Sequence, residues 1–374
     1  MDGETREVEF ILSQLAQVAN LPMEQATTIP AQAYTNKAFL ALELKEIFAK
    51  EWVCAGRVEE VPNPGDYFAT EIAGEPLLIV RGEDDRVRVL SNVCRHRWAQ
   101  VASGHGTTKR FVCPYHAWTY DCEGRLVHTR FMEKSRAFDP DCRLPEISSE
   151  IWQGFLFVNL DGKATPLGSR LGSLLTRIED YHLEEMTRFT GADEIWRTNW
   201  KLLTENFTEA YHNPQTHKHS LEPAVPAALT RYPGGEDAYS LMIAPVNPQC
   251  PPREPHHPDL SGTKRSEVVL ACIFPSLVFA LSPERVFYMC LSPVGVDNVQ
   301  TRWGVGTWGA LPKDPPLEEI NRLYHEVNDE DKLRLESIQK TIRSRYLAPG
   351  PLSYMEQPNW ELYRYMARRL IPNA

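Results

Sequence analysis

Short β-prone runs alternate with turn residues between about residues 66 and 160 of the chain. The runs Tyr67–Ile72, Leu77–Arg81 and Val87–Val93 have the composition of strands. Gly82–Asp85 is rich in turn residues and predicts a hairpin between the second and the third run. Because another strand-like run follows at Gly154–Leu160, this part of the chain predicts a small β-rich module.

The segments on either side of this module mix helical and strand patterns. Apolar residues recur at helical spacing in the ranges Leu40–Glu51, Leu167–Tyr181, Trp200–Tyr211 and Leu317–Arg345. Strand-like runs occupy Arg188–Trp196, Glu267–Phe274, Val286–Leu291 and Val299–Thr307. The last helical range is strongly charged, and Asn328 and Asp329 can break it. We therefore expect an α+β protein in which a β module, residues 46–162, is inserted into a domain formed by residues 1–45 and 163–374.

Composition limits the kind of protein. The chain has 374 residues, of which 42% are hydrophobic and 24% charged, the balance of a globular protein long enough for two domains. A formal net charge of -10 argues against nucleic acid or an anionic membrane as a dedicated partner. The acidic N-terminus does not look like a secretory signal and no window is apolar enough to span a membrane, so we expect a cytoplasmic protein.

The strongest chemical signal is a pair of mixed cysteine and histidine motifs. Cys94 and His96 are two positions apart, and after sixteen intervening residues Cys113 is followed, three positions on, by His116. Each pair fits on one tight loop, and two thiolates with two imidazoles are the ligand set of a Rieske [2Fe–2S] centre. A structural zinc site is the alternative, although zinc fingers usually pair like ligands with like. The eight cysteines of a cytosolic-looking chain favour metal ligation over a disulfide framework.

A second candidate metal site lies at the end of the range Trp200–Tyr211. His212 and His217 are five positions apart, and the chain can fold back across Pro214 so that both imidazoles meet one ion. Two imidazoles and one carboxylate form the facial triad of non-haem Fe(II) oxygenases, which leaves positions open for O₂ and water. Surface histidines at a helix end are the alternative, and the carboxylate has to come from elsewhere in the chain.

Around these motifs the sequence resembles the α-subunit family of Rieske non-haem iron oxygenases. The segments Asn92–Arg97, Cys113–Trp118 and Gly154–Asp161 carry the resemblance, which extends from about residue 48 to residue 350. It implies an all-β Rieske domain inserted in a helix-grip-like catalytic domain with an antiparallel sheet and flanking helices. It also assigns the cluster ligands, two to each iron: Cys94 with Cys113, and His96 with His116.

The same resemblance completes the mononuclear iron site. It selects His217 rather than His219 as the partner of His212, and it selects Asp331 as the carboxylate ligand. Asp329 belongs to the same charged run, so a shift in register is one alternative for this ligand. A solvated helical charge run with no ligand role is the other.

The resemblance also gives roles to Glu209 and Asn206, which precede His212 in the chain. Glu209, on the same side of the predicted helix as His212, would bridge the iron site to the Rieske histidine His116 of a neighbouring subunit. Asn206, one turn earlier, matches a family position near the iron. The alternatives are a solvated carboxylate for Glu209 and ordinary polar packing for Asn206. The resemblance also implies a homotrimer with head-to-tail contacts.

No convincing dinucleotide-binding fingerprint is present, so we expect electrons from NAD(P)H to arrive through a separate reductase, with or without a ferredoxin. The resemblance implies O₂-dependent hydroxylation or oxidative dealkylation, and the pattern at Asn328–Tyr346 resembles the monooxygenase and demethylase branch. The apolar strands Val268–Phe274 and Leu277–Leu281 favour a small aromatic or xenobiotic substrate. A quaternary ammonium substrate of the carnitine or betaine type, which needs an aromatic cage, is one alternative. A Rieske electron carrier without the second site is the other.

Overall fold

The computed structural model describes residues 3–186, 188–250, 256–308 and 317–371. They form two compact units, one made of Ala49–Ala164 and the other of Met1–Phe48 together with Thr165–Ala374. The expected α+β class is confirmed, because one unit is built of β-sheets and the other of a single sheet with helices. Among these residues no helix is long and apolar enough to cross a membrane.

The smaller unit is built around a seven-stranded antiparallel sheet. In spatial order its strands are β1 (Val53–Arg57), β10 (Phe155–Asn159), β9 (Glu146–Trp152), β4 (Val87–Ser91), β3 (Glu75–Arg81), β2 (Asp66–Ile72) and β5 (His105–Thr107). The predicted hairpin joins β3 to β4. Leu78 of β3 pairs with Leu90 of β4, and both side chains are fully buried. Cross-strand burial of this kind holds the β-prone runs in one register.

A three-stranded sheet of the same unit frames the second cysteine and histidine motif. It consists of β6 (Arg110–Val112), β7 (Thr119–Asp121) and β8 (Leu126–His128). Phe111 pairs with Tyr120 across β6 and β7, and both rings are buried in the core cluster that also contains Cys94 and Cys113. The two motif loops therefore leave from one packed core, which fixes where their ligand atoms lie.

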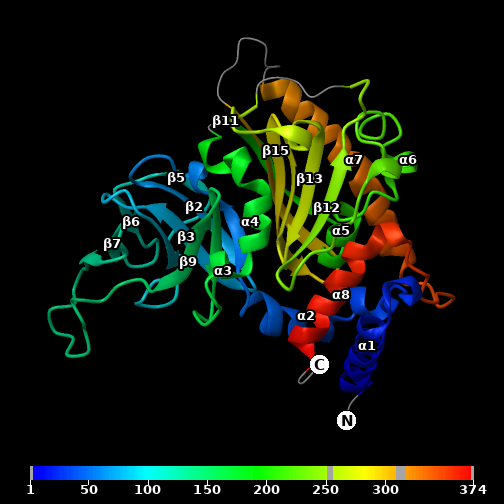
Figure 1. Cartoon of the computed structure of the whole chain (residues 1–374). Coiled ribbons are helices and arrows are strands. Elements are labelled where there is room, and N and C mark those ends of the chain that lie inside the picture. The colour runs from blue at the N-terminus through cyan, green and yellow to red at the C-terminus, as the bar shows by residue number, and fades with distance from the viewer. Residues whose placement is uncertain (1–2, 187, 251–255, 309–316, 372–374) are drawn as a thin grey trace. The chain divides into compact units, whose positions relative to one another are not determined.

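The larger unit contains a six-stranded antiparallel sheet (Figure 1). In spatial order its strands are β11 (Arg188–Trp196), β16 (Asn298–Thr307), β15 (Arg285–Gly295), β14 (Leu277–Ser282), β13 (Glu267–Ile273) and β12 (Tyr239–Pro245). The strand-like runs found in this part of the sequence all lie in this sheet. β12 was not predicted, because its residues are buried on both faces and show no alternation.

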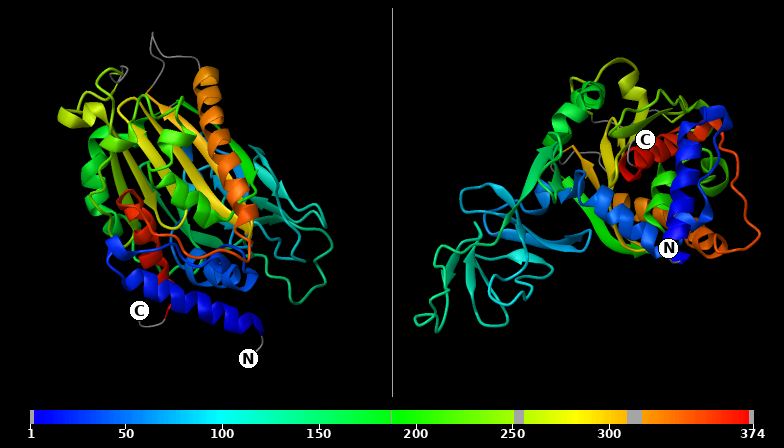
Figure 2. Two further views of the ribbon diagram at one scale, coloured as in Figure 1. Left: turned by 90° about the vertical axis from the view of Figure 1, so that its right-hand side faces the viewer. Right: turned by 90° about the horizontal axis from the view of Figure 1, so that it is seen from below.

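Helices flank this sheet (Figures 1 and 2). Three of them contact its strands directly, namely α5 (Trp200–Phe207), α7 (Leu317–Thr341) and α8 (Gln357–Leu370). α1 (Gly3–Asn20) packs against α8. The shorter helices are α2 (Lys37–Glu43), which continues into a π-helical turn at Leu44–Phe48, α3 (Leu167–Arg170), α4 (Gly172–Ile178) and α6 (Asn213–Thr216). The sequence pattern did not predict α1 or α8.

The predicted helix Trp200–Tyr211 is too long. α5 ends at Phe207, where the Thr208 hydroxyl lies 2.8 Å from the carbonyl oxygen of Thr204 and 3.0 Å from Oδ1 of Asn359. A new helix, α6, then begins with Pro214 in its first turn, the position in a helix that proline tolerates. Glu209 therefore lies in the connection between two helices rather than on a helix face.

Two other helical predictions need correction. α7 is continuous through Asn328 and Asp329, because Val327 and Leu335 bury one face of the helix and outweigh the modest helix propensity of the Asn-Asp pair. The predicted helix Leu167–Tyr181 is divided into α3, α4 and a 3₁₀ turn.

Candidate metal centres

The two cysteine and histidine motifs form loops with the same main-chain hydrogen bonds. The N–H of Cys94 donates to the carbonyl of Ala99 at 2.8 Å, and the N–H of Trp98 donates to the carbonyl of Cys94 at 3.0 Å. In the second loop Cys113, Trp118 and Ala117 repeat this pattern at 2.8 and 3.0 Å. Trp98 and Ala117 each have a positive φ, of 61° and 58°. Each loop therefore presents its cysteine from the same kind of turn, whatever the spacing to its histidine.

The side chains of these loops converge. The rings of His96 and His116 lie 4.6 Å apart, and Trp118 stacks on His96 at 4.9 Å. Both cysteines, Cys94 and Cys113, are buried and form no disulfide. The Tyr120 hydroxyl lies 3.4 Å from the sulfur of Cys94.

The electrostatics of this group fit an iron–sulfur cluster. Burial raises the pKa of the Cys113 thiol, so a thiolate here needs a cation such as iron beside it. Burial, together with the charges of His116 and Arg97, lowers the pKa of His96 and favours the neutral imidazole that ligates metals. Nδ1 of His96 is buried and has no hydrogen-bond partner in the described part of the chain. A Rieske cluster would satisfy this nitrogen and both thiolates.

A second group of ligands comes together in the larger unit. His212 and His217 flank α6, and Asp331 lies in α7. One ligand atom from each of the three lies within 4.8 Å of the others. Nε2 of His217 is 3.0 Å and Nε2 of His212 is 3.5 Å from Oδ1 of Asp331. This donor set fits a mononuclear iron held by two imidazoles and one carboxylate.

The outer nitrogens of both imidazoles face carboxylates. Nδ1 of His212 lies 2.5 Å from Oε1 of Glu209, and Nδ1 of His217 lies 2.7 Å from Oε2 of Glu330. Glu330 also accepts a hydrogen bond from the Ser220 hydroxyl at 2.6 Å. With these acceptors each Nδ1 carries the ring proton, which leaves each Nε2 free to bind a metal.

Burial alone would lower the pKa of His217, since it is almost fully enclosed. The hydrogen bonds and negative charges of Asp331 and Glu330 outweigh burial and raise the pKa overall. In a metal-free site these carboxylates therefore attract a proton to the place where an iron would supply the positive charge.

The remaining predicted residues also lie in or beside this group. Nδ2 of Asn206 is 3.1 Å from Oδ1 of Asp331 and 3.4 Å from Nε2 of His212. Asp329 and His219, the competitors for two ligand positions, are exposed and outside the cluster. The contact of Glu330 with His217 was missed, because adjacent acidic residues in one helix give no sequence signal of which faces inward.

Two family models match the chain. The Rieske [2Fe-2S] domain matches residues 51–144, and the ring hydroxylating alpha subunit (catalytic domain) matches residues 173–371. Since the second match alone spans more than half of the chain, the protein belongs to the family of ring-hydroxylating oxygenase alpha subunits, the Rieske non-haem iron oxygenases. The resemblance found in the sequence is confirmed.

Two curated proteins are similar in sequence to this chain. The carnitine monooxygenase oxygenase subunit of Escherichia coli (strain K12) is 37% identical over 201 residues, 52% of this chain and 53% of the relative. The chain thus spans about half the length of that relative. The glycine betaine monooxygenase oxygenase subunit of Pseudomonas aeruginosa (strain UCBPP-PA14) is 24% identical over 368 residues, 88% of this chain and 86% of the relative.

Solved structures share the fold. A quaternary ammonium Rieske monooxygenase, CntA, in complex with an inhibitor superimposes with a TM-score of 0.82 at 22% identity, covering 96% of this chain and 98% of that one. Naphthalene 1,2-dioxygenase from Rhodococcus sp. gives a TM-score of 0.77 at 20% identity, covering 99% and 98%. At these identities the likeness establishes the fold alone.

Proposed function

We propose that this chain is the oxygenase component of a multicomponent Rieske monooxygenase. The observation that carries the proposal is the convergence of His212, His217 and Asp331, each imidazole backed by its own carboxylate. When bound, the cluster would store an electron and the mononuclear iron would activate dioxygen for insertion into a C–H bond.

The protein's own part is to hold the ligands in one geometry. Glu209 and Glu330 keep the ring protons on Nδ1 of His212 and His217, so that both Nε2 atoms face Asp331. Asn206 donates to Oδ1 of Asp331 and limits how that carboxylate can turn. Positions not occupied by these three ligands stay open for dioxygen and water.

For the substrate we favour a quaternary ammonium compound over the small aromatic one that the apolar strands suggested. The curated relatives named above act on carnitine and glycine betaine, according to their names. A cluster of aromatic rings also connects α5 and α7 to strands β15 and β16. Phe287 lies 4.9 Å from Tyr324, 6.1 Å from Phe207 and 6.1 Å from Trp303 between ring centroids.

In the proposal, these rings would receive the methylated cation of the substrate. Phe207 follows Asn206 directly in α5. In α7, Tyr324 precedes Asp331 by seven residues, so Tyr324 and Asp331 lie on the same face of that helix. A trimethylammonium group is bound by such ring faces through cation–π attraction. In the proposal, this aromatic cluster would serve as the cage that this substrate class needs.

Arg285 adds a second recognition element at the edge of the same cluster. Its side chain is 12% exposed, its Nη2 lies 3.7 Å from Oε1 of Glu284, and its Nε is buried without a hydrogen-bond partner among the described residues. Arg285 also hydrogen-bonds the Tyr324 side chain; burial raises the pKa of Tyr324, and the charge and hydrogen bond of Arg285 partly offset this rise. An unsatisfied guanidinium nitrogen suits a substrate carboxylate. We therefore favour a zwitterion with a trimethylammonium and a carboxylate group.

Electron supply is proposed from a separate NAD(P)H reductase, with or without a ferredoxin.

We further propose a homotrimer in which Glu209 of one subunit approaches His116 of the next. The structure of one quaternary ammonium Rieske monooxygenase gave insights into inter-subunit electron transfer in that protein. Glu209 already binds Nδ1 of His212 through Oε1, and its Oε2 accepts from the main-chain N–H of the same residue at 3.1 Å.

A substrate screen tests the proposal. Protein reconstituted with iron, sulfide and a reductase is offered carnitine, glycine betaine, choline and an aromatic methyl ether, and trimethylamine and formaldehyde release are measured. We expect NAD(P)H-dependent product from a trimethylammonium substrate and none from the ether. Product from the ether alone would return the substrate to the aromatic class. Protein that holds the cluster but no third iron would instead be an electron carrier.

Arg285→Gln sharpens the screen. We expect the KM for a carboxylate-bearing substrate to rise by about 10-fold or more, whereas the KM for choline stays unchanged. Arg231→Gln is the control, because Arg231 is largely exposed and pairs with Glu267. An equal change for both substrates would remove the carboxylate-binding role of Arg285.

A further inference from the structure

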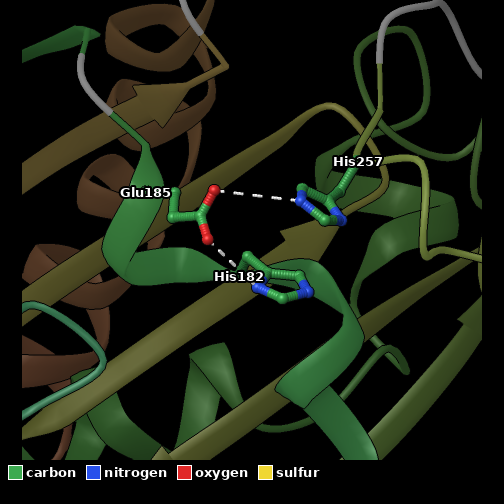
Figure 3. Close-up of side chains that lie close together, drawn as sticks. All are labelled: His182, Glu185 and His257. Atoms are coloured by element: carbon green, nitrogen blue, oxygen red, sulfur yellow. Dashed lines mark ion pairs between the residues drawn. The ribbon is translucent and has the colours of Figure 1, made fainter.

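A third group of metal-ligating side chains lies in the larger unit, apart from both iron centres. It consists of His182, Glu185 and His257, shown in Figure 3. Glu185 ends a short 3₁₀ segment (Leu183–Glu185) ahead of β11, His182 directly precedes that segment, and His257 lies in the connection between β12 and β13. One ligand atom from each residue lies within 4.8 Å of the others.

The two imidazoles are arranged as a pair. Their rings stack with centroids 3.8 Å apart and an interplanar angle of 29°. On one side, Glu185 faces both rings, with Oε1 3.3 Å from Nδ1 of His182 and Oε2 3.8 Å from Nε2 of His257 (Figure 3). On the other side, Oδ2 of Asp259 lies 2.9 Å from Nε2 of His182 and 3.7 Å from Nδ1 of His257.

The carboxylates are placed around these two imidazoles in the same way as at the proposed iron site. In both groups each imidazole turns one nitrogen towards a shared carboxylate and the other towards a carboxylate behind it. Metal-bound histidines usually donate their second N–H in this way. Nδ1 of His182, Nε2 of His257 and the Glu185 carboxylate face one another. Two nitrogens and one carboxylate are a ligand set that suits zinc, with water in the fourth position. The side chains of His182, Glu185 and His257 are 27%, 55% and 16% exposed, so an ion can reach them from solvent.

We propose that His182, Glu185 and His257 bind a divalent transition-metal ion of the zinc type, with Asp259 orienting both imidazoles from behind. The bound ion would tie the 3₁₀ segment before β11 to the connection before β13. Trp308, which follows β16, packs against His257 with centroids 4.9 Å apart, so the ion would link segments adjoining three strands of the sheet.

One contact defines the proton that the metal displaces. The main-chain N–H of Asp259 donates to Nδ1 of His257 at 3.2 Å, so without metal the neutral ring carries its proton on Nε2, facing Glu185. Metal binding at Nε2 therefore requires a tautomer change with no net loss of a proton. The proton leaves Nε2 and one is taken up at Nδ1, so the ring stays neutral and its Nδ1–H faces the Asp259 carboxylate in place of the bond from the Asp259 main-chain N–H. For His182 no such change is needed, because its Nε2 already lies against Asp259.

Zinc binding to the iron-loaded holoenzyme tests the proposal. Equilibrium dialysis against Zn²⁺, with zinc and iron counted in the same samples, is carried out on the native protein, on His182→Ala, on His257→Ala and on Glu185→Gln. We expect one zinc per chain in the native protein, with iron unchanged. We expect affinity to fall by at least about 10-fold in each variant, and by a similar factor in Asp259→Asn.

His256→Ala is the matched control, because His256 lies beside His257 in the chain but outside the cluster. It should bind zinc as the native protein does. Equal zinc affinity in the native protein and in a His182→Ala/His257→Ala double variant would overturn the proposal, as would a native protein that takes up zinc only by losing iron.

A spectroscopic measurement covers the case in which the variants fail to fold. Zinc X-ray absorption is recorded on the His212→Ala protein, whose iron triad is broken while the third group is intact. We expect a first shell with two imidazoles and no sulfur. A shell of sulfur ligands, or one without imidazole, contradicts the assignment. Neither readout requires turnover, so both are independent of the proposed oxygenase activity.

Discussion

The two iron centres are assembled in opposite ways. In the smaller unit Cys94, His96, Cys113 and His116 come from two loops with the same main-chain hydrogen bonds, close together in the sequence. In the larger unit, the two imidazoles proposed as ligands flank α6 and the proposed carboxylate ligand comes from α7, far along the chain. The first centre is thus encoded locally, whereas the second exists only once the sheet and α7 have packed.

The two centres should be separable by single substitutions, and this is the largest expected effect. His212→Ala should lose the mononuclear iron and keep the visible spectrum of the cluster, because one of three ligands is removed. Cys113→Ser should lose the cluster spectrum and labile sulfide. Both should lower turnover by about 10³-fold or more. Iron content, sulfide content and absorption spectra provide the measurements.

A His212→Ala protein that retained its full iron content would contradict this ligand assignment. Loss of both centres in either variant would contradict their independence. His219→Ala serves as the control, since His219 is exposed and lies outside the ligand group.

Glu209 should affect turnover more than metal content. In Glu209→Ala we expect both metals to be retained, while kcat falls by about 10- to 100-fold because Nδ1 of His212 loses its acceptor. Glu209→Asp should recover part of the loss. Steady-state kinetics normalised to bound iron provide the measurement, and unchanged turnover would show that Glu209 is an ordinary carboxylate.

The register of α7 can be tested with adjacent acidic residues. Glu330→Gln should weaken iron binding by about 10-fold, because the acceptor behind His217 loses its charge. Asp329→Asn is the matched control, since Asp329 is exposed in the same helical turn and should leave iron binding unchanged. Iron loss on titration with a chelator measures both. The reverse result would favour Asp329 over Asp331 as the carboxylate ligand.

These contrasts show what the sequence could and could not predict. The cysteine and histidine motifs could be found because each fits on one loop. β2, β3, β4 and β10 in the smaller unit, and every strand of the six-stranded sheet except β12, could be found because glycine and polar turn residues bound them. The residue pattern alone could not identify the inward side of α7, because it depends on which residues, such as Val327 and Leu335, pack inward, and Asp331 was selected only through the family resemblance. β12 shows no alternation, and a short apolar run of that kind fits a buried helix equally well.

The smallest effect concerns stability rather than chemistry. Burial raises the pKa of Glu205 in α5 to about 8, although its hydrogen bond from the Tyr34 hydroxyl at 2.7 Å lowers it. The folded protein therefore keeps this proton up to about pH 8, whereas the unfolded chain loses it near the ordinary value of 4.5. Stability contributed by this group is complete below about pH 4.5 and is lost as pH rises to about 8.

Glu205→Gln should remove this dependence. Between about pH 6 and pH 8 we expect the free energy of unfolding to fall by about 1–2 kcal/mol more in the native protein than in the variant. Denaturant titrations at both pH values provide the measurement. Parallel losses in the two proteins would show that Glu205 is ionised in the fold.

The matching loops of the smaller unit have a consequence for how such a protein can diversify. Their shape is held by peptide groups of the cysteines and of the residues four and five positions later, not by the intervening side chains. Arg95, Arg97 and Tyr115 are exposed between the ligands. Mutation can therefore change the charge and shape presented to an electron donor at these positions while the cluster's anchoring bonds stay intact.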